Sequence, residues 1–286
     1  MPTLRDLRND ISQALIELYD DREAQQIANQ LLEHLSGTRT WDFSYVETKP
    51  EVTTAAKNAL SRLLKHEPLQ HILGEVEFYG LRLKVSPSVL IPRPETEELV
   101  QHIINFYQDR PKPTRVLDIG TGSGCLILTL AKEKIGTTYY GVDISESALL
   151  VAQQNAWLNK LSVNWLHEDF LNTTRLDREG AFDLVVSNPP YIPDQERVTL
   201  SRQVHDFEPQ NALFVPDDEP IIFYKQLADW CIKRGLAADG HLFVETHHNY
   251  AKEVAAYWKQ VGLENVCVKK DLQEKWRFVH GNLKKS

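Results

Sequence analysis

One pattern in the second half of the chain restricts its fold most strongly: short apolar runs alternate with stretches of helical periodicity. The apolar runs predict strands near residues 115–119, 138–143, 163–167, 182–187, 241–246, 264–270 and 276–280. The stretches between them predict helices near residues 123–133, 145–159, 220–234 and 249–261. Such alternation is typical of a doubly wound, mostly parallel sheet. Residues 272–275 lie near the junction of the last two strands, and this connection is too short for a helical crossover, so we expect an antiparallel hairpin there.

The first expected strand ends in a glycine-rich turn that opens a helix. Residues 118–124 read Asp-Ile-Gly-Thr-Gly-Ser-Gly. Glycine lets the backbone pass close to a ligand and adopt positive φ. The Gly-x-Gly-x-Gly spacing differs from the Gly-x-Gly-x-x-Gly of dinucleotide binders. Roughly twenty residues further on, the second strand ends at Asp143, where folds of this kind hold the hydroxyls of a ribose.

The fourth expected strand ends in Ser187-Asn188-Pro189-Pro190-Tyr191. Two consecutive prolines remove two backbone donors, so the turn offers a planar amide, carbonyl oxygens and an aromatic face. Such a turn suits a flat NH2 group that must present its lone pair to an electrophile. Asn-Pro is also an ordinary turn signal. Because ligands bind at the carboxyl ends of parallel strands, we expect this turn and the glycine-rich turn to converge.

The first seventy residues have a different character. Three stretches, beginning near residues 4, 24 and 52, carry apolar residues at helical spacing, and Gly37 and Pro50 mark helix limits. Their narrow apolar stripes require the helices to pack on one another. We interpret residues 1–70 as a helical bundle that docks a partner, 71–90 as a β-hairpin linker and 91–286 as the catalytic domain. A bundle that only stabilises the chain is the alternative.

Composition limits the classes of function. The net charge of −8 argues against a surface built to grip nucleic acid, although it leaves room for a local basic groove. No signal-like segment and no run of eighteen apolar residues occurs, so we expect a cytoplasmic protein without membrane contact. The scattered Cys125, Cys231 and Cys267 fit reduced core thiols. No residues have the spacing of metal ligands, so no metal is expected.

Residues 91–97, Ile-Pro-Arg-Pro-Glu-Thr-Glu, begin another helix, with a proline near its first position and acidic residues in its first turn. Capping alone would explain this composition. Arg93 lies between two prolines, is held stiffly, and could extend to the cofactor region. We therefore include Arg93 and Glu95 among the candidate site residues.

Together these motifs resemble those of the PrmC/HemK family of protein-(glutamine-N5) methyltransferases, which modify peptide-chain release factors. The resemblance covers nearly the whole chain and rests on residues 67–74, 91–97, 118–124, 188–192, 207–209 and 212–213. Asn-Pro-Pro-Tyr alone also occurs in DNA and RNA amine methyltransferases. The Pro-Arg-Pro-Glu-Thr-Glu segment behind a helical N-terminal domain is far more specific.

The resemblance implies an α/β, seven-stranded, Rossmann-like methyltransferase domain behind a small all-helical domain and a β-hairpin linker. It also implies S-adenosylmethionine as cofactor, S-adenosylhomocysteine as product, and the glutamine of the Gly-Gly-Gln motif of class I release factors as substrate. We expect a monomer, with no stable binding of nucleic acid.

Each candidate residue has an expected role. The turn over Gly120, Thr121, Gly122, Ser123 and Gly124 is assigned to the methionine part of the cofactor. Asp118 is placed near its ammonium, Asp143 at the ribose, Asp169 and Phe170 at the adenine, and Asn188 near both ligands. In the substrate site, the Asn188 side-chain oxygen and the Pro189 carbonyl each accept one N–H of the amide. Pro190 has no N–H to compete, and Tyr191 packs against the amide plane; Asn188, Pro189 and Tyr191 are the expected catalytic residues.

Rival functions and departures from the family pattern are also visible. A methyltransferase acting on an exocyclic amine of DNA or RNA would use the same turn. A nicotinamide-dependent oxidoreductase and a non-catalytic adaptor are both disfavoured by the glycine spacing together with Asn-Pro-Pro-Tyr. Residues 215–220, 246–247 and 272–275 lack the Gly-x-Asp-Gly, Ile-Gly and hairpin glycine typical of the family. These differences lie in loops, so they are expected to affect loop geometry and substrate range.

Overall fold

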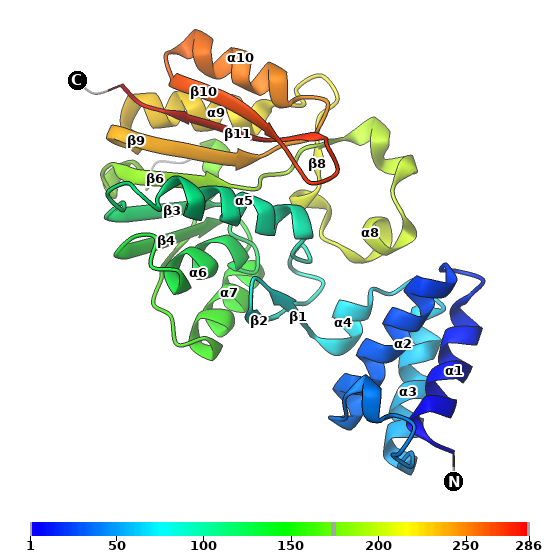
Figure 1. The fold of residues 1–286 in the computed structure, drawn as a ribbon. Coiled ribbons are helices and arrows are strands. Elements are labelled where there is room, and N and C mark those ends of the chain that lie inside the picture. The colour runs from blue at the N-terminus through cyan, green and yellow to red at the C-terminus, as the bar shows by residue number, and fades with distance from the viewer. Residues whose placement is uncertain (1, 173–175, 285–286) are drawn as a thin grey trace. The chain divides into compact units, whose positions relative to one another are not determined.

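The computed structural model describes residues 2–172 and 176–284. The chain forms two compact units: residues 1–74 with 202–207, and residues 75–201 with 208–286. The first unit is helical and the second is an α/β sandwich (Figure 1). Among the described residues, no helix has the length and apolar character needed to cross a bilayer.

The helical unit is built from amphipathic helices with ordinary end signals. Thr3 and Asp6 form a capping box at the start of α1, Gly37 ends α2 with a φ of 68°, and Pro50 opens α3. Its helices are α1 (Leu4–Leu15), α2 (Asp21–Ser36), α3 (Pro50–Leu63), α4 (Leu69–Leu73) and α8 (Arg202–Phe207), with a 3-10 turn at Thr40–Asp42. The three long helices predicted from apolar spacing are confirmed.

The apolar stripes of these helices meet in one core. Leu4, Ile11 and Leu15 of α1 pack with residues of α2 and α3 and with Phe43. In the same unit the Gln203 side-chain amide of α8 donates a hydrogen bond of 2.6 Å to the Tyr19 hydroxyl. The helical bundle therefore includes a segment that lies far along the chain.

The larger unit is organised by a seven-stranded sheet with the order β10-β11-β9-β6-β3-β4-β5. Its strands are β3 (Arg115–Ile119), β4 (Thr138–Asp143), β5 (Asn164–His167), β6 (Phe182–Ser187), β9 (Leu236–Glu245), β10 (Glu264–Lys270) and β11 (Trp276–Asn282). All neighbouring pairs are parallel except those of β11, which runs antiparallel to β9 and β10. The predicted sheet and its terminal hairpin are confirmed.

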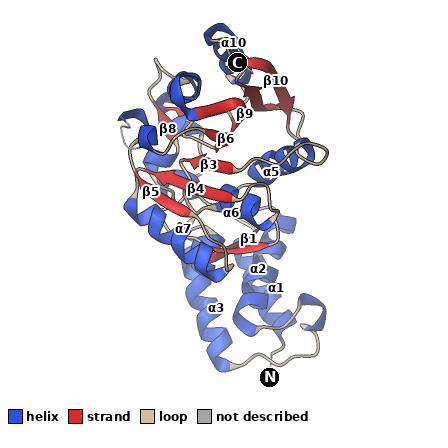
Figure 2. Ribbon diagram, turned by 90° about the vertical axis from the view of Figure 1, so that its left-hand side faces the viewer, coloured by secondary structure: helices blue, strands red, loops and turns tan. Residues whose placement is uncertain are grey.

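Helices cover both faces of this sheet (Figure 2). One buried cluster joins the sheet to α9 (Ile222–Trp230) and α10 (Ala251–Val261), and the other joins it to α5 (Pro94–Phe106) and α6 (Cys125–Lys132). Helix α7 (Glu146–Leu158) adds Ala156 to the second cluster. Burial on both faces explains why the central strands β3 and β6 are mostly apolar, while the edge strands β5 and β10 carry exposed polar residues.

Short elements not predicted from the sequence complete the unit. They are the two-residue parallel pair β7 (Ile192–Pro193) and β8 (Phe214–Val215), the 3-10 turns Phe170–Asn172, Leu176–Arg178, Asp194–Thr199 and Gln210–Ala212, and a π-helical turn at Cys231–Gly235. Strand β9 also begins five residues before the predicted residue 241, because residues 236–240 extend its pairing with β6 through an irregular register.

The predicted linker differs from the observed structure at its start. Residues 71–73 belong to α4, which ends where Gly74 adopts a φ of 69°. The hairpin itself, β1 (Glu75–Phe78) and β2 (Leu81–Lys84), belongs to the larger unit. Tyr79 and Gly80 both have positive φ, as a tight two-residue hairpin turn requires.

A candidate active site at the carboxyl ends of the strands

A cavity of about 400 Å³ lies at the carboxyl ends of β3, β4, β5 and β6. The glycine-rich turn lines it through Gly120, Thr121, Gly122 and Ser123. The other predicted residues along its wall are Arg93, Asp143, Asp169, Phe170, Asn188, Pro189 and Pro190. The fold thus brings the motifs of four strands to one site.

The glycine-rich turn is fixed to the neighbouring strand. The backbone N–H groups of Gly120 and Thr121 both donate to the Val142 carbonyl at 2.9 Å, and Gly122 N donates to Asp143 Oδ2 at 2.8 Å. Gly120 and Gly122 have φ of 72° and 55°, and a Cβ on either would meet no protein atom within 4 Å. Open space above a left-handed turn allows a ligand to approach the backbone closely.

The two predicted carboxylates after β4 and β5 both line the cavity and both bind backbone groups. Asp143 Oδ1 accepts from Ser145 N at 2.9 Å, and burial raises the pKa of Asp143. Asp169 accepts from Leu171 N at 3.0 Å and from the Asn172 side chain at 2.7 Å, so it caps the turn that carries Phe170. A carboxylate oxygen has a second lone pair, so these contacts leave acceptor sites for a ligand.

Asp118 lies behind the turn and is fully buried, and it is not among the described residues that line the cavity. Its Oδ2 accepts from Thr121 Oγ1 at 2.7 Å, whereas Oδ1 has no hydrogen-bond donor among the described residues. Burial raises the pKa of Asp118 to about 7. A buried acceptor without a donor beneath a ligand-sized cavity fits a cationic group, although the predicted contact with an ammonium stays a prediction. Gly124, with a φ of 82°, begins α6 and also lies outside the cavity lining.

The Asn188 turn is held beside the glycine-rich turn by the strand that precedes it. Ser187 is fully buried, and its hydroxyl donates to the Ile119 carbonyl at 2.6 Å, which ties the end of β6 to the end of β3. Beyond the turn, Ile192 N donates to the Leu213 carbonyl at 3.0 Å. Anchored on both sides, the turn has little freedom to move relative to the glycine-rich turn.

Two residues from distant parts of the chain orient the Asn188 side chain. Asn188 Nδ2 lies 3.0 Å from Thr96 Oγ1, and Thr96 Oγ1 donates to Glu245 Oε2 at 2.7 Å. Because a threonine hydroxyl has one proton and gives it to the carboxylate, its oxygen must accept from Asn188. The Asn188 oxygen therefore faces away from Thr96, and it is buried with no donor among the described residues.

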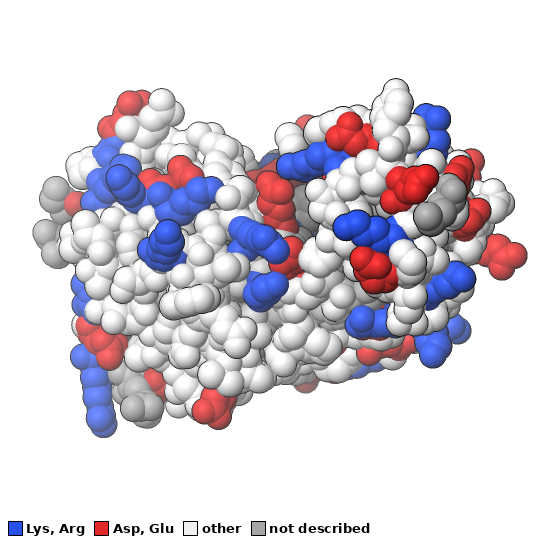
Figure 3. Space-filling view, turned by 90° about the horizontal axis from the view of Figure 1, so that it is seen from below, with Lys and Arg blue, Asp and Glu red and all other residues white. Residues whose placement is uncertain are grey.

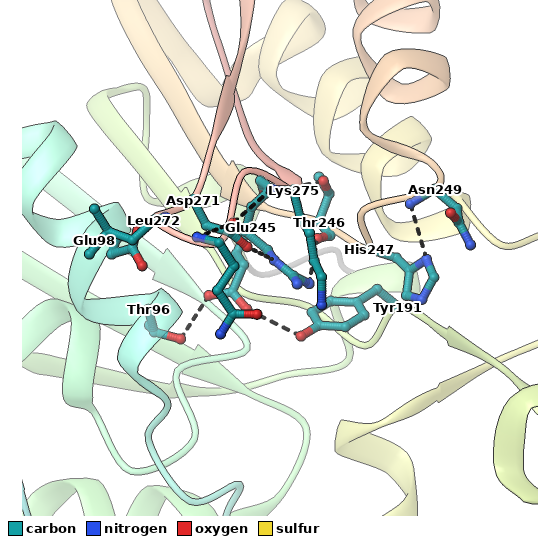
Figure 4. Close-up of polar contacts among 12 residues, drawn as sticks. Thr96, Glu98, Tyr191, Glu245, Thr246, His247, Asn249, Asp271, Leu272 and Lys275 are labelled. Atoms are coloured by element: carbon teal, nitrogen blue, oxygen red, sulfur yellow. Dashed lines mark hydrogen bonds and ion pairs between the residues drawn. The ribbon is translucent and has the colours of Figure 1, made fainter. Parts of the chain in front are cut away.

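Tyr191 is bound to the same carboxylate. Its hydroxyl donates to Glu245 Oε1 at 3.2 Å (Figure 4), and its ring lies 6.1 Å from that of His247. Burial raises the pKa of Tyr191 well above its ordinary value, so the phenol remains protonated and can donate. Tyr191 is not among the described residues that line the cavity, and its predicted packing against a substrate amide stays a prediction.

Arg93 and Glu95 have different environments. Arg93 lines the cavity and pairs with Glu208, a carboxylate only 4% exposed that also accepts from Ile91 N at 3.2 Å. Burial raises the pKa of Glu208, and the Arg93 charge opposes that rise. Glu95 lies in the first turn of α5 and is not among the described residues of the cavity wall.

Comparisons with known proteins identify the family. A family model described as Methyltransferase small domain matches residues 96–206. The release factor glutamine methyltransferase of Flavobacterium psychrophilum is 33% identical in an alignment of 289 positions that covers 98% of this chain and 99% of that protein. The Bacteroides thetaiotaomicron protein of the same name is 34% identical in an alignment of 277 positions that covers 95% of this chain and 97% of that protein. The chain belongs to the release factor glutamine methyltransferase family.

One solved structure is similar in fold to this member of the release factor glutamine methyltransferase family. The hMettl16 catalytic domain, solved with an RNA hairpin, is 13% identical and covers 84% of both chains with a TM-score of 0.56. At this identity the likeness concerns the fold alone. The family predicted from the sequence motifs is confirmed by the curated relatives.

The loops that depart from the family pattern have defined contacts. In the β10–β11 hairpin, where a glycine is typical, Glu274 adopts a φ of 62° and Asp271 Oδ1 accepts from Gln273 N and Lys275 N. After β9, His247 Nε2 lies 3.3 Å from Glu196 Oε2. His247, at the position of the expected glycine, thus contacts the neighbouring 194–199 turn, whereas Asp271 and Glu274 bind within the hairpin itself.

Sequence reasoning missed three functional candidates: Thr96, Glu208 and Glu245. Thr96 and Glu208 lie in segments that match the family, and Glu245 ends an expected strand just before residues that depart from it. Local pattern explains Thr96 as part of a helix start and Glu245 as part of a strand. Their separations from their partners, 92 residues for Asn188–Thr96, 149 for Thr96–Glu245 and 115 for Arg93–Glu208, hide these contacts from local patterns.

Proposed function

We propose that this chain transfers a methyl group from S-adenosylmethionine to the side-chain amide nitrogen (N5) of the glutamine in the Gly-Gly-Gln motif of class I peptide-chain release factors. The observation that carries the proposal is the Asn188 oxygen, which is buried at the cavity wall with no donor among the described residues. The NH2 group of a primary amide can donate the hydrogen bond that this oxygen does not receive from the described residues. Membership of the release factor glutamine methyltransferase family supports the same substrate.

The cavity residues fit the cofactor. The open backbone of the glycine-rich turn suits the methionine part, the free lone pairs of Asp143 suit ribose hydroxyls, and Asp169 and Phe170 suit the adenine. The proposed cofactor residues of the cavity wall are Gly120, Thr121, Gly122, Ser123, Asp143, Asp169, Phe170 and Asn188. Asp118 and Gly124, which do not line it, are proposed to support the glycine-rich turn from behind. The bound cofactor supplies a methyl group that its sulfonium charge has already activated.

The protein must make a poor nucleophile available. The lone pair of an amide nitrogen is delocalised into its carbonyl, so the site has to fix the group and increase electron density on nitrogen. The Asn188 oxygen and the Pro189 carbonyl each accept one N–H of the substrate, and Pro190 has no N–H to compete. As positive charge develops on nitrogen, both acceptors bind more strongly, which stabilises the transition state. The methylated amide is acidic enough to release its extra proton afterwards, so no carboxylate base is required.

The helical unit is proposed to dock the release factor. It exposes Trp41 (72%) and Tyr45 (87%), and aromatic side chains are enriched in protein interfaces. The net charge of −8 suits a basic protein partner. We propose that the enzyme works as a monomer in the cytoplasm without stable binding to nucleic acid.

The test is transfer of labelled methyl from S-adenosylmethionine to an unmethylated release factor. Two other acceptors are run beside it: the same factor with glutamate in place of the motif glutamine, and a pool of DNA and RNA. Label on the intact factor alone is expected. Label only on nucleic acid would mean that the Asn188 turn binds an exocyclic amine of a base. The net charge of −8 disfavours that result, and so do the interspersed acidic and basic side chains on the face shown in Figure 3.

A further inference from the structure

A single buried carboxylate holds both ends of the Asn188–Tyr191 turn. Glu245 is 1% exposed at the end of β9. Its Oε2 receives the Thr96 hydroxyl at 2.7 Å and its Oε1 receives the Tyr191 hydroxyl at 3.2 Å (Figure 4). Its own carbonyl accepts from the Tyr224 hydroxyl at 3.0 Å, which fixes the backbone behind it. Two hydroxyls therefore hold the Glu245 side chain, and a third holds its backbone.

Thr96 connects this carboxylate to the substrate site. It is 2% exposed, lines the cavity with Asn188, and lies in the first turn of α5. The donor order runs from Asn188 Nδ2 to Thr96 Oγ1 and from Thr96 Oγ1 to Glu245 Oε2. Glu245 is not among the described residues of the cavity wall. Thr96, which does line the wall, links Glu245 to Asn188 by hydrogen bonds.

This chain of hydrogen bonds orients the Asn188 side chain and also polarises its amide group. Each bond in a chain polarises the next, and a charged acceptor at its end strengthens the effect. Donation from the Asn188 amide nitrogen toward a carboxylate increases electron density on its oxygen. That oxygen is the acceptor proposed to bind the substrate N–H.

We propose that Thr96 and Glu245 are positioning residues that orient and polarise Asn188 through this relay, making its oxygen a stronger acceptor for the substrate amide. This inference rests on the proposed function and assigns a purpose to two residues outside the Asn-Pro-Pro-Tyr motif. Burial raises the pKa of Glu245, while the Thr96 hydrogen bond and the Arg277 charge lower it. The two hydroxyl donors and the nearby guanidinium match a carboxylate in its charged form.

The kinetic test compares Thr96→Val, Thr96→Ser and Glu245→Gln with the wild type, using labelled S-adenosylmethionine and an unmethylated release factor. Thr96→Val keeps the shape but removes the hydroxyl, and we expect kcat to fall about 10- to 100-fold with the KM for the cofactor nearly unchanged. Thr96→Ser restores the hydroxyl and most of kcat. Glu245→Gln keeps the shape without the charge, so its loss is expected to be intermediate.

A matched control removes an equally buried hydroxyl elsewhere. Thr129 is fully buried, and its hydroxyl donates only to the Cys125 carbonyl of its own helix, at 2.7 Å. Thr129→Val is expected to leave kcat near the wild-type value. Thermal unfolding of every variant separates a folding defect from a catalytic one. If the loss is catalytic, Thr96→Ser and Thr96→Val have similar Tm values, but only Thr96→Ser recovers kcat.

A measurement without substrate tests the relay independently of the reaction. In protein labelled with 15N-asparagine, the Asn188 side-chain signals are those that disappear in Asn188→Ala. We expect Thr96→Val to move the hydrogen-bonded amide proton toward the position of a free amide, and Thr96→Ser to leave it in place. Unmoved signals, or an unchanged kcat in Thr96→Val, would overturn the inference. A wild type that fails to methylate the factor would refute the proposed function instead, while the amide signals still decide whether the relay exists.

Discussion

Replacing Asn188 by alanine removes the acceptor on which amide recognition depends. Its oxygen is buried without a donor among the described residues, and its nitrogen lies 3.0 Å from Thr96 Oγ1. Loss of one hydrogen bond to a group that becomes charged costs about 1–3 kcal/mol. If this free energy is lost from the transition state alone, kcat falls about 5- to 150-fold. A substrate amide that is also misplaced adds to the loss.

The assay is single-turnover methyl transfer with enzyme in excess, beside calorimetric titration with S-adenosylhomocysteine. The rate of transfer in Asn188→Ala is expected to fall by a larger factor than the affinity for S-adenosylhomocysteine. Asn105→Ala, on the exposed face of α5, is the matched control and should behave as wild type. Transfer by Asn188→Ala at a rate within about threefold of wild type, less than the loss of one such bond requires, would refute the acceptor role.

Three further predictions concern the residues around this turn. Burial raises the pKa of Asp118 to about 7 from 3.8, so between these pH values the folded protein keeps a proton that the unfolded chain has lost. The free energy of unfolding therefore decreases as the pH rises from about 4 to about 7. The Tm of the ligand-free wild type should thus fall relative to that of Asp118→Asn between about pH 4 and about pH 7; parallel curves would contradict it. Gly122→Ala should weaken binding of the cofactor. Gly37 also has positive φ and open space, so Gly37→Ala should lower the Tm by a similar amount but leave cofactor binding intact. Equal cofactor affinities of the two variants would exclude a ligand at the glycine-rich turn. Arg93→Ala should destabilise the fold by about 1–3 kcal/mol in urea unfolding, with partial recovery when Glu208→Gln removes the stranded charge; no loss would show that the pair is unimportant.

The sheet could be predicted because its signals are local. Apolar runs and helical spacing marked the strands of the large sheet other than β9, and the helices that cover it, within a few residues. The short junction at 272–275 required the antiparallel hairpin. Residues 236–240 lack an apolar run, so the early start of β9 follows only from pairing with β6. Glu274 shows the same limit, because a left-handed residue other than glycine leaves little trace in sequence.

The candidate site was predicted in its parts but not in its connections. Each motif marked the end of one strand, and the rule for parallel sheets brought those ends together. The contacts that orient Asn188 join the start of α5 to the end of β9, and no periodicity links residues 149 positions apart. For the same reason the Arg93–Glu208 pair was visible only as two separate segments of the family pattern.

The central claim is that the Asn188 turn presents acceptors to a glutamine side-chain amide. Tandem mass spectrometry of a release factor incubated with the enzyme and S-adenosylmethionine tests it most directly. The account predicts one added methyl group on the side-chain nitrogen of the Gly-Gly-Gln glutamine, absent when Asn188→Ala replaces the wild type. A methyl group on any other residue, or full modification by the variant, would contradict it.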